Sequence, residues 1–308
     1  MPSKLNHPSG LDIEDARRVI QAALAEDVGS GDIPSSAVIP ADLRFHGVMR
    51  ARHAMVIAGL PVAEETFLTV VPDASFRALI ADGDAVQAGA TLVEIDGSAQ
   101  GLLTAERTAL NLLQILSGIA TATREYVERI RGTGCILLDT RKAIPGMRRL
   151  SKYATRCGGA QNHRMGLFDA ILIKDNHIAV CGSISQAVSQ AKLAARTCGP
   201  STRQLTIEIE CDTLAQVREA VEAGVDTVLL DNMSLEELRQ AVRLVGGRAK
   251  TEASGGVALQ TVRAIAESGV DFVSVGRITE SAPAVDIGLD WNQNRHERKT
   301  ARHNARER

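Results

Sequence analysis

The sequence predicts an α/β protein whose larger part is an open, irregular barrel of parallel strands. After residue 134, short apolar runs rich in β-branched residues alternate with helical patterns, which is the rhythm of a parallel sheet. The runs at 135–138 and 170–173 are continuous, as expected for strands buried on both faces. The predicted strands are residues 135–139, 170–174, 205–210, 226–231, 249–253 and 271–275, with helices at 183–196, 214–223, 235–245 and 259–268. Six strands are too few for an eight-unit barrel, and a doubly wound open sheet is the competing architecture.

The first part of the chain has shorter elements and more turns. Apolar spacing of three and four residues predicts a helix at 11–26. A small α+β module follows, with strands at 45–52, 76–80 and 91–95 and a helix at 61–68, and then a long helix at 102–130. We expect a flexible leader at 1–10, an N-terminal domain at 11–117 and the barrel domain at 118–290. The tail at 291–308 is basic, and we expect it to be disordered.

Composition excludes several classes of protein. The 308 residues include 35 Lys+Arg and 37 Asp+Glu, a near-neutral balance that argues against a dedicated nucleic-acid binder. No apolar signal or membrane-spanning segment is present in the sequence, so we expect a cytoplasmic protein that does not bind membranes. Five cysteines without a CxxC pair indicate reduced thiols.

Polar side chains follow every predicted strand of the barrel. The ends are Asp139-Thr140-Arg141-Lys142, Lys174-Asp175-Asn176-His177, Glu208-Ile209-Glu210, Asp231-Asn232, Glu252-Ala253-Ser254-Gly255-Gly256 and Ser274-Val275-Gly276-Arg277. Solvation or helix capping explains any single end. Because the carboxyl ends of parallel strands build the active site of α/β barrels, six such ends in succession predict one convergent site.

The predicted site has three chemical parts. The segment 139–177 is strongly cationic and suits a polyanionic small molecule. Ser254-Gly255-Gly256 and Gly276 precede helices and suit phosphate, although plain turn glycines would explain either loop alone. Glu210 and Asp231 suit ribose hydroxyls or a partly hydrated Mg²⁺. A phosphorylated sugar that reacts with an acidic partner would fill all three parts.

Several long motifs carry a family resemblance that covers most of the chain. They are AERTALN, DTRKAIPGMR, GGAQNHR, IKDNH, EASGGV and FVSVGR. With these motifs the sequence resembles the quinolinate phosphoribosyltransferases. The resemblance implies an N-terminal α/β sandwich, an open α/β barrel, and a homodimer in which one subunit covers the other's barrel, with a hexamer left open. It also implies a Mg²⁺-assisted reaction of quinolinate with 5-phosphoribosyl-1-pyrophosphate that yields nicotinate mononucleotide, pyrophosphate and carbon dioxide, on the de novo route to NAD.

The resemblance also implies residue roles. Arg107 would reach the neighbouring subunit's quinolinate, and Arg141, His163, Arg164 and Lys174 would hold the dicarboxylate beside Thr140. The catalytic residues would be Lys142 at the pyrophosphate, and Glu210 and Asp231 at the ribose and metal. The 5-phosphate cradle would be Ser254, Gly255, Gly256, Val275, Gly276 and Arg277.

Two positions depart from the family pattern, and three rival functions stay open. Pro34-Ser35-Ser36 replaces a common Thr-Thr, and Glu280 could change the charge of the phosphate loop. The rivals are a related enzyme with another acceptor (the molybdenum-utilisation type), a non-catalytic metabolite-binding protein, and a barrel aldolase with Lys174 as a Schiff base.

Overall fold

The computed structural model describes residues 10–197 and 205–291. They form two compact units: unit 1 comprises residues up to Ala122, Pro145–Gly158 and the segment from Ala282, and unit 2 comprises Thr123–Ile144 and Gly159–Ser281. The predicted contiguous division at 117/118 differs from these units, because a helix and the last strand return to unit 1. Apart from Gly10 and Trp291, the predicted leader and basic tail lie outside the described residues.

Unit 1 contains an antiparallel sheet with the strand order β12-β1-β5-β3. Its strands are β1 (Arg44–Ala51), β3 (Ser75–Ala78), β5 (Thr91–Ser98) and β12 (Ile287–Trp291), and β2 (Met55–Val56) pairs with β4 (Ala85–Val86). The alternating burial of β5 places Leu92 in a core with Phe67 of α3 (Leu60–Val70) and Leu102 of α4 (Ala99–Ile130). This arrangement of helices on a sheet confirms the predicted α/β N-terminal part.

Three more helices complete unit 1. Helix α1 (Ile13–Val28) is capped by Asp12, and the short α2 (Ile33–Val38) is capped by Asp32. Helix α5 (Arg148–Gly158) lies in the cationic segment and was not predicted. Its apolar stripe, Leu150, Tyr153, Ala154 and Cys157, packs in one core with residues of α1.

Helix α5 divides the cationic segment 139–177 between the two units. Arg149 pairs with Asp12 of unit 1, and Arg156 donates to the Gly10 carbonyl at 2.9 Å. Lys152 is fully buried in unit 1. The charged side chains of α5 therefore make contacts within unit 1, and none of them was among the predicted site residues.

Unit 2 contains six parallel strands in the order β6-β11-β10-β9-β8-β7, and β6 and β7 form its two open edges. The strands are β6 (Ile136–Leu138), β7 (Ile171–Ile173), β8 (Ile207–Cys211), β9 (Thr227–Asp231), β10 (Lys250–Ser254) and β11 (Phe272–Ser274). All six predicted strands and the open parallel architecture are confirmed.

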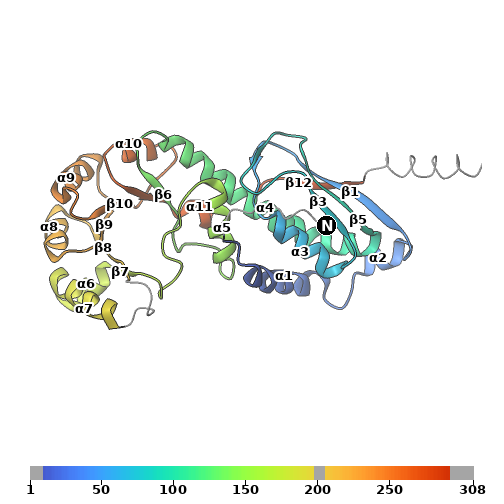
Figure 1. Ribbon diagram of the computed structural model, residues 1–308, viewed down its shortest axis with the longest axis horizontal. Helices are drawn as coiled ribbons and strands as arrows, with labels where there is room; N and C mark the ends of the chain where they lie inside the picture. Colours follow the sequence, from blue (N-terminus) through green and yellow to red (C-terminus); the bar gives the residue numbers. More distant parts are fainter. Residues whose placement is uncertain (1–9, 198–204, 292–308) are drawn as a thin grey trace, which may run out of the picture. The chain divides into compact units, whose positions relative to one another are not determined.

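Helices cover one face of this sheet. In Figure 1, α7 (Ile184–Thr197), α8 (Leu214–Ala223), α9 (Leu235–Val245) and α10 (Val262–Ala266) lie along the outer side of the strands. Alternate strand residues such as Val228 and Leu230 pack against Val217 and Leu238 of these helices. Two short helices at strand ends, α6 (Asp175–Cys181) and α11 (Arg277–Glu280), were not predicted.

Two expectations from composition concern the cysteines and membrane-spanning segments. Cys135, Cys157, Cys181 and Cys211 are free thiols, as predicted. Among the described helices, none combines the length and the apolar character that crossing a bilayer requires.

Candidate active site

A cavity of about 610 Å³ opens at the carboxyl ends of the strands in unit 2. It is lined by Thr140, Arg141, Lys142, His163, Arg164, Leu172, Lys174, Glu210, Leu229, Asp231, Asn232, Glu252, Ser254, Gly255, Gly256 and Ser274. Most of the predicted site residues therefore meet around one cavity. Asn232, Glu252 and Ser274 also line it; the sequence placed them at the polar strand ends but assigned them no role.

The two-residue period of the strands explains which side chains face this cavity. In β8, Ile207, Ile209 and Cys211 are buried in the core that packs against the helices. Glu208 and Glu210 therefore point to the opposite face, which lines the barrel. In the same way, Leu229 and Asp231 of β9 share the inner face, whereas Val228 and Leu230 pack outward.

The segment before β7 is bound to the end of β6 by a buried carboxylate. Asp139 is fully buried, and it accepts the His163 backbone N–H at 2.9 Å and the Asn162 side-chain amide at 2.6 Å. Backbone hydrogen bonds from Gln161 to Leu137 and from Asp139 to Gln161 extend the pairing. This attachment places His163 and Arg164 at the cavity.

The cationic side chains of the cavity are suited to bind an anion. Burial and the neighbouring Arg141 both lower the pKa of Arg164, because they disfavour its charged form. The Nε atoms of Arg141 and Arg164 are buried and have no hydrogen-bond partner within the described chain. A bound carboxylate would satisfy these donors and relieve the repulsion between the two guanidinium groups.

Acidic residues, Glu210 and Asp231, line the same cavity. Glu210, Asp212 and Asp231 each offer a carboxylate oxygen, and the three oxygens lie within 4.8 Å of one another. Lys174 Nζ is 2.8 Å from Glu210 Oε2, so one of the three charges already has a partner. Oxygen ligands at this spacing fit a hydrated Mg²⁺.

The loop after β6 is packed against Gly276. A Cβ atom added at Gly276 would lie 2.9 Å from Lys142 Cδ, so the side chain of Lys142 runs over this glycine. Thr279 donates to the Lys142 carbonyl at 2.5 Å, and Thr140 accepts the Lys142 N–H at 3.0 Å. These contacts fix the backbone from which Lys142 reaches the cavity.

The second predicted phosphate loop lies outside the lining of the cavity. Val275 is buried in the core and its N–H is bound to the Leu138 carbonyl. Gly276 is covered by Lys142, and Arg277 is exposed beside Tyr126. Among the predicted cradle residues, only Ser254, Gly255 and Gly256 line the described cavity.

A strained turn supports the first phosphate loop. Asn232 is the one non-glycine residue of the described chain with a positive φ, at 53°. Gly255 has φ of 88°, and a Cβ atom there would lie 2.2 Å from Asn232 Oδ1. The close approach of these two loops therefore requires glycine at position 255. Strain of this kind is typical of functional sites.

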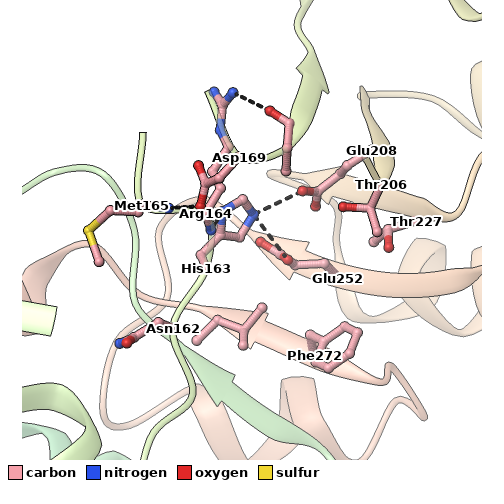
Figure 2. Close-up of a pocket in the computed structure, with 12 residues that line it drawn as sticks. Asn162, His163, Arg164, Met165, Asp169, Thr206, Glu208, Thr227, Glu252 and Phe272 are labelled. Carbon is pink, nitrogen blue, oxygen red and sulfur yellow. Dashed lines mark hydrogen bonds and ion pairs between the residues drawn. The ribbon is translucent and has the colours of Figure 1, made fainter. Parts of the chain in front are cut away.

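A second cavity of about 340 Å³ lies nearer the amino ends of the strands, where Thr227 and Phe272 line it. Figure 2 shows the His163 ring pointing toward the carboxylates of Glu208 and Glu252. Glu252 and His163 line both cavities. Burial and the nearby Glu208 raise the pKa of Glu252 to about 8. The sequence signal for Glu208 is its two-residue distance from Glu210 on the same strand.

Arg107 belongs to the other unit. It is exposed on α4, and it makes no hydrogen bond or ion pair with any described residue. Its neighbour Glu106 has a raised pKa because it is half-buried, and Arg107 partly offsets this effect.

Comparison with known proteins gives the family of the chain. Residues 32–117 match the N-terminal domain of quinolinate phosphoribosyl transferase, and residues 119–290 match the C-terminal domain. The nicotinate-nucleotide pyrophosphorylase [carboxylating] of Mycobacterium leprae is 41% identical over 92% of this chain and 99% of that protein. A probable enzyme of the same name from Bacillus subtilis is 38% identical over 89% of this chain and 92% of that protein. The structure of nicotinate-nucleotide pyrophosphorylase from Francisella tularensis is similar with a TM-score of 0.86 and 37% identity, over 94% of this chain and 100% of that one. The chain belongs to the quinolinate phosphoribosyltransferase family.

Proposed function

We propose that this enzyme transfers the phosphoribosyl group of 5-phosphoribosyl-1-pyrophosphate to quinolinate and releases pyrophosphate and carbon dioxide, forming nicotinate mononucleotide for NAD synthesis. The observation that carries this proposal is that cationic and acidic side chains line one cavity, in a chain of this family. The cationic side chains suit a dicarboxylate, and the acidic side chains suit a ribose.

The acceptor would lie against Arg141, Arg164 and Lys174. Two guanidinium groups with unsatisfied buried Nε atoms can form paired hydrogen bonds with carboxylates. The pyridine nitrogen is then free to attack the anomeric carbon. A cavity that aligns the two reactants supplies much of the rate enhancement, and no protein nucleophile is required.

Charge separation develops as the bond to pyrophosphate breaks. Positive charge grows on the ribose, where Glu210 and Asp231 would stabilise it, and negative charge grows on the leaving group, near Lys142. We propose that Glu210 and Asp231, with Asp212, hold a partly hydrated Mg²⁺, which would neutralise the diphosphate. The quaternised pyridine then stabilises the electron pair left on the ring carbon when the adjacent carboxylate leaves as carbon dioxide, and that carbon takes up a proton from water.

We also propose that the enzyme is a homodimer in which Arg107 contacts quinolinate of the partner subunit. The exposure of Arg107 and its lack of a described ion pair support this role. Sedimentation would give the mass of the assembly. Mixing Arg107→Ala subunits with subunits that carry Lys142→Ala would restore turnover only if Arg107 acts across the interface.

The test of the proposed function uses quinolinate labelled in the carboxylate next to the nitrogen. We expect labelled carbon dioxide and pyrophosphate in equal amounts, only when 5-phosphoribosyl-1-pyrophosphate and Mg²⁺ are both present. Nicotinate, which has one carboxylate, should be a poor acceptor. Turnover with nicotinate but not quinolinate would favour the rival with another acceptor, and binding without pyrophosphate release would favour a metabolite-binding protein.

A further inference from the structure

Asn232 connects two parts of the cavity that have separate roles in the proposed reaction. It follows Asp231 at the carboxyl end of β9, and its backbone is left-handed, with φ of 53°. This conformation is unfavourable for residues with a Cβ atom, and asparagine is among those that tolerate it best. A residue keeps such a conformation only when the surrounding contacts hold it there. The contacts of Asn232 therefore show what the strained turn does.

The side-chain amide of Asn232 is bound to the Asp231 carboxylate. Its Nδ2 donates to Asp231 Oδ2 at 2.6 Å. Because a carboxylate accepts hydrogen bonds and does not donate them, the nitrogen of the amide and not its oxygen must face Asp231. No other residue among those described donates a hydrogen bond to this carboxylate or forms an ion pair with it. Asn232 is therefore the contact that fixes the direction of the Asp231 side chain.

The opposite side of Asn232 lies against the loop at residues 254–256. The Asn232 N–H donates to the Ser254 carbonyl at 3.0 Å, which continues the pairing of β9 with β10 by one residue. The amide oxygen of Asn232 lies 2.2 Å from the position that a Cβ atom of Gly255 would take. The amide group thus fills the space of the missing side chain at residue 255 and supports the loop from one side.

The loop that Asn232 supports presents two backbone donors. Gly255 and Gly256 have φ of 88° and 59°, and within the described chain neither N–H donates a hydrogen bond. Both residues line the cavity. Successive N–H groups of a turn can bind an anion such as a phosphate. A phosphate bound here and a ribose hydroxyl bound at Asp231 would belong to one molecule, so the distance between the two sites must match that molecule.

We propose that Asn232 is a positioning residue that holds the Asp231 carboxylate and the loop at residues 254–256 at the spacing of a 5-phosphorylated ribose. This inference rests on the proposed function. Two contacts made by one ligand reinforce each other only when the protein holds both partners in place for simultaneous contact. The Asn232 side chain contacts both partners. Its loss should therefore weaken the binding of ribose 5-phosphate much more than that of a phosphate ester without a ribose.

Asn232→Gly separates positioning from folding. Glycine adopts a φ of 53° without strain, so the melting temperature should change little while both side-chain contacts are lost. Asn232→Ala loses the same contacts but keeps a Cβ atom in the left-handed conformation, so it should also lower the melting temperature. Gln240→Ala is the matched control. It removes an exposed amide on α9 that donates to Glu236 at 3.0 Å, away from the residues that line the cavity.

Calorimetry of the full chain in buffer without Mg²⁺ would compare ribose 5-phosphate with ethyl phosphate. Both Asn232 variants should weaken ribose 5-phosphate by about tenfold, as for one lost hydrogen bond to a charged group, and ethyl phosphate by less than about threefold. Gln240→Ala should bind both ligands as the unaltered protein does. An equal loss for both ligands would show that Asn232 only supports the loop, and no loss would show that it positions neither partner. Either result would overturn the proposal.

A double-mutant cycle tests whether Asn232 acts through Asp231. Once Asp231→Ala has removed the carboxylate, adding Asn232→Gly should lower the affinity for ribose 5-phosphate by less than about threefold. Full, independent losses from the two substitutions would contradict the inference. If the unaltered protein binds ethyl phosphate as tightly as ribose 5-phosphate, it has no ribose site, and the proposed function fails together with this inference. A preference for ribose 5-phosphate that does not depend on Asn232 would refute this inference alone.

Discussion

Replacing Gly276 by Ala tests whether the position of Lys142 limits catalysis. The added Cβ would lie 2.9 Å from Lys142 Cδ, whereas carbon atoms in contact prefer about 3.5–4.0 Å. The lysine side chain must therefore move by roughly 0.5–1 Å. A displacement of about 1 Å in a positioned group can cost about a hundredfold in rate, so we expect kcat/KM to fall by about ten- to a hundredfold.

The same substitution should leave the fold intact. Gly276 has φ of −69°, which any residue adopts, and it begins α11, where Ala is the better helix former. The melting temperature should therefore change little. A large loss of stability would show that the clash is relieved by the backbone and not by the lysine.

A double-mutant cycle with Lys142→Ala provides the control. Lys142→Ala removes the atoms that the new methyl group would meet. If Gly276→Ala acts through Lys142, the double variant should be no less active than Lys142→Ala alone. The assay is pyrophosphate release with both substrates varied. Full activity of Gly276→Ala, or additive losses in the double variant, would refute the reasoning.

Four further predictions concern the site and the core. Lys174→Met should raise the KM for quinolinate by about ten- to a hundredfold, since a charge-assisted hydrogen bond contributes about 1.5–3 kcal/mol. An increase in KM smaller than that of a distant Lys→Met variant would contradict the placement of Lys174 at the quinolinate site. Asp82 accepts the Tyr153 hydroxyl at 2.7 Å and the amides of Gly59 and Leu60, so Tyr153→Phe should lower the free energy of unfolding in urea by about 1 kcal/mol and Asp82→Ala by about 3 kcal/mol or more. Because folding raises the pKa of Glu252 from 4.5 to about 8, its neutral form stabilises the native protein at low pH, and this contribution is lost as pH rises toward about 8. Glu252→Gln should remove that loss, and parallel urea-unfolding profiles across this pH range would contradict it. Removal of Mg²⁺ by a chelator should abolish turnover and leave the melting temperature nearly unchanged.

The parallel strands could be predicted because burial on both faces leaves a local signal. Runs such as Val228–Leu230 are apolar without interruption, and the polar residues that follow fall at one edge of the sheet. The rule that this edge holds the site brought most of the predicted residues to one cavity. This rule cannot predict the position of Arg107, because its proposed partner would lie in another subunit.

Helix α5 and strand β12 were missed for different physical reasons. The apolar stripe of α5 is present in the sequence. Because the segment is also rich in positive charge, it was interpreted as part of a ligand site and not as a helix. Strand β12 owes its place to pairing with β1, more than two hundred residues earlier, and local patterns carry no signal for such a distant partner.

The inner carboxylates were missed because buried glutamates are rare. Glu208 and Glu252 were assigned to strand ends, where solvated acids are ordinary. The strand period places them one step deeper, inside the barrel. Val275 and Arg277 do not line the described cavity, and proximity to a glycine in sequence does not show which face of the turn a side chain occupies.

A crystal structure with quinolinate and an unreactive analogue of 5-phosphoribosyl-1-pyrophosphate would test the central claim most directly. We predict the two carboxylates against Arg141, Arg164 and Lys174, with the ribose hydroxyls beside Glu210 and Asp231. Ligands bound elsewhere on the barrel, or quinolinate with its carboxylates away from both arginines, would contradict the account.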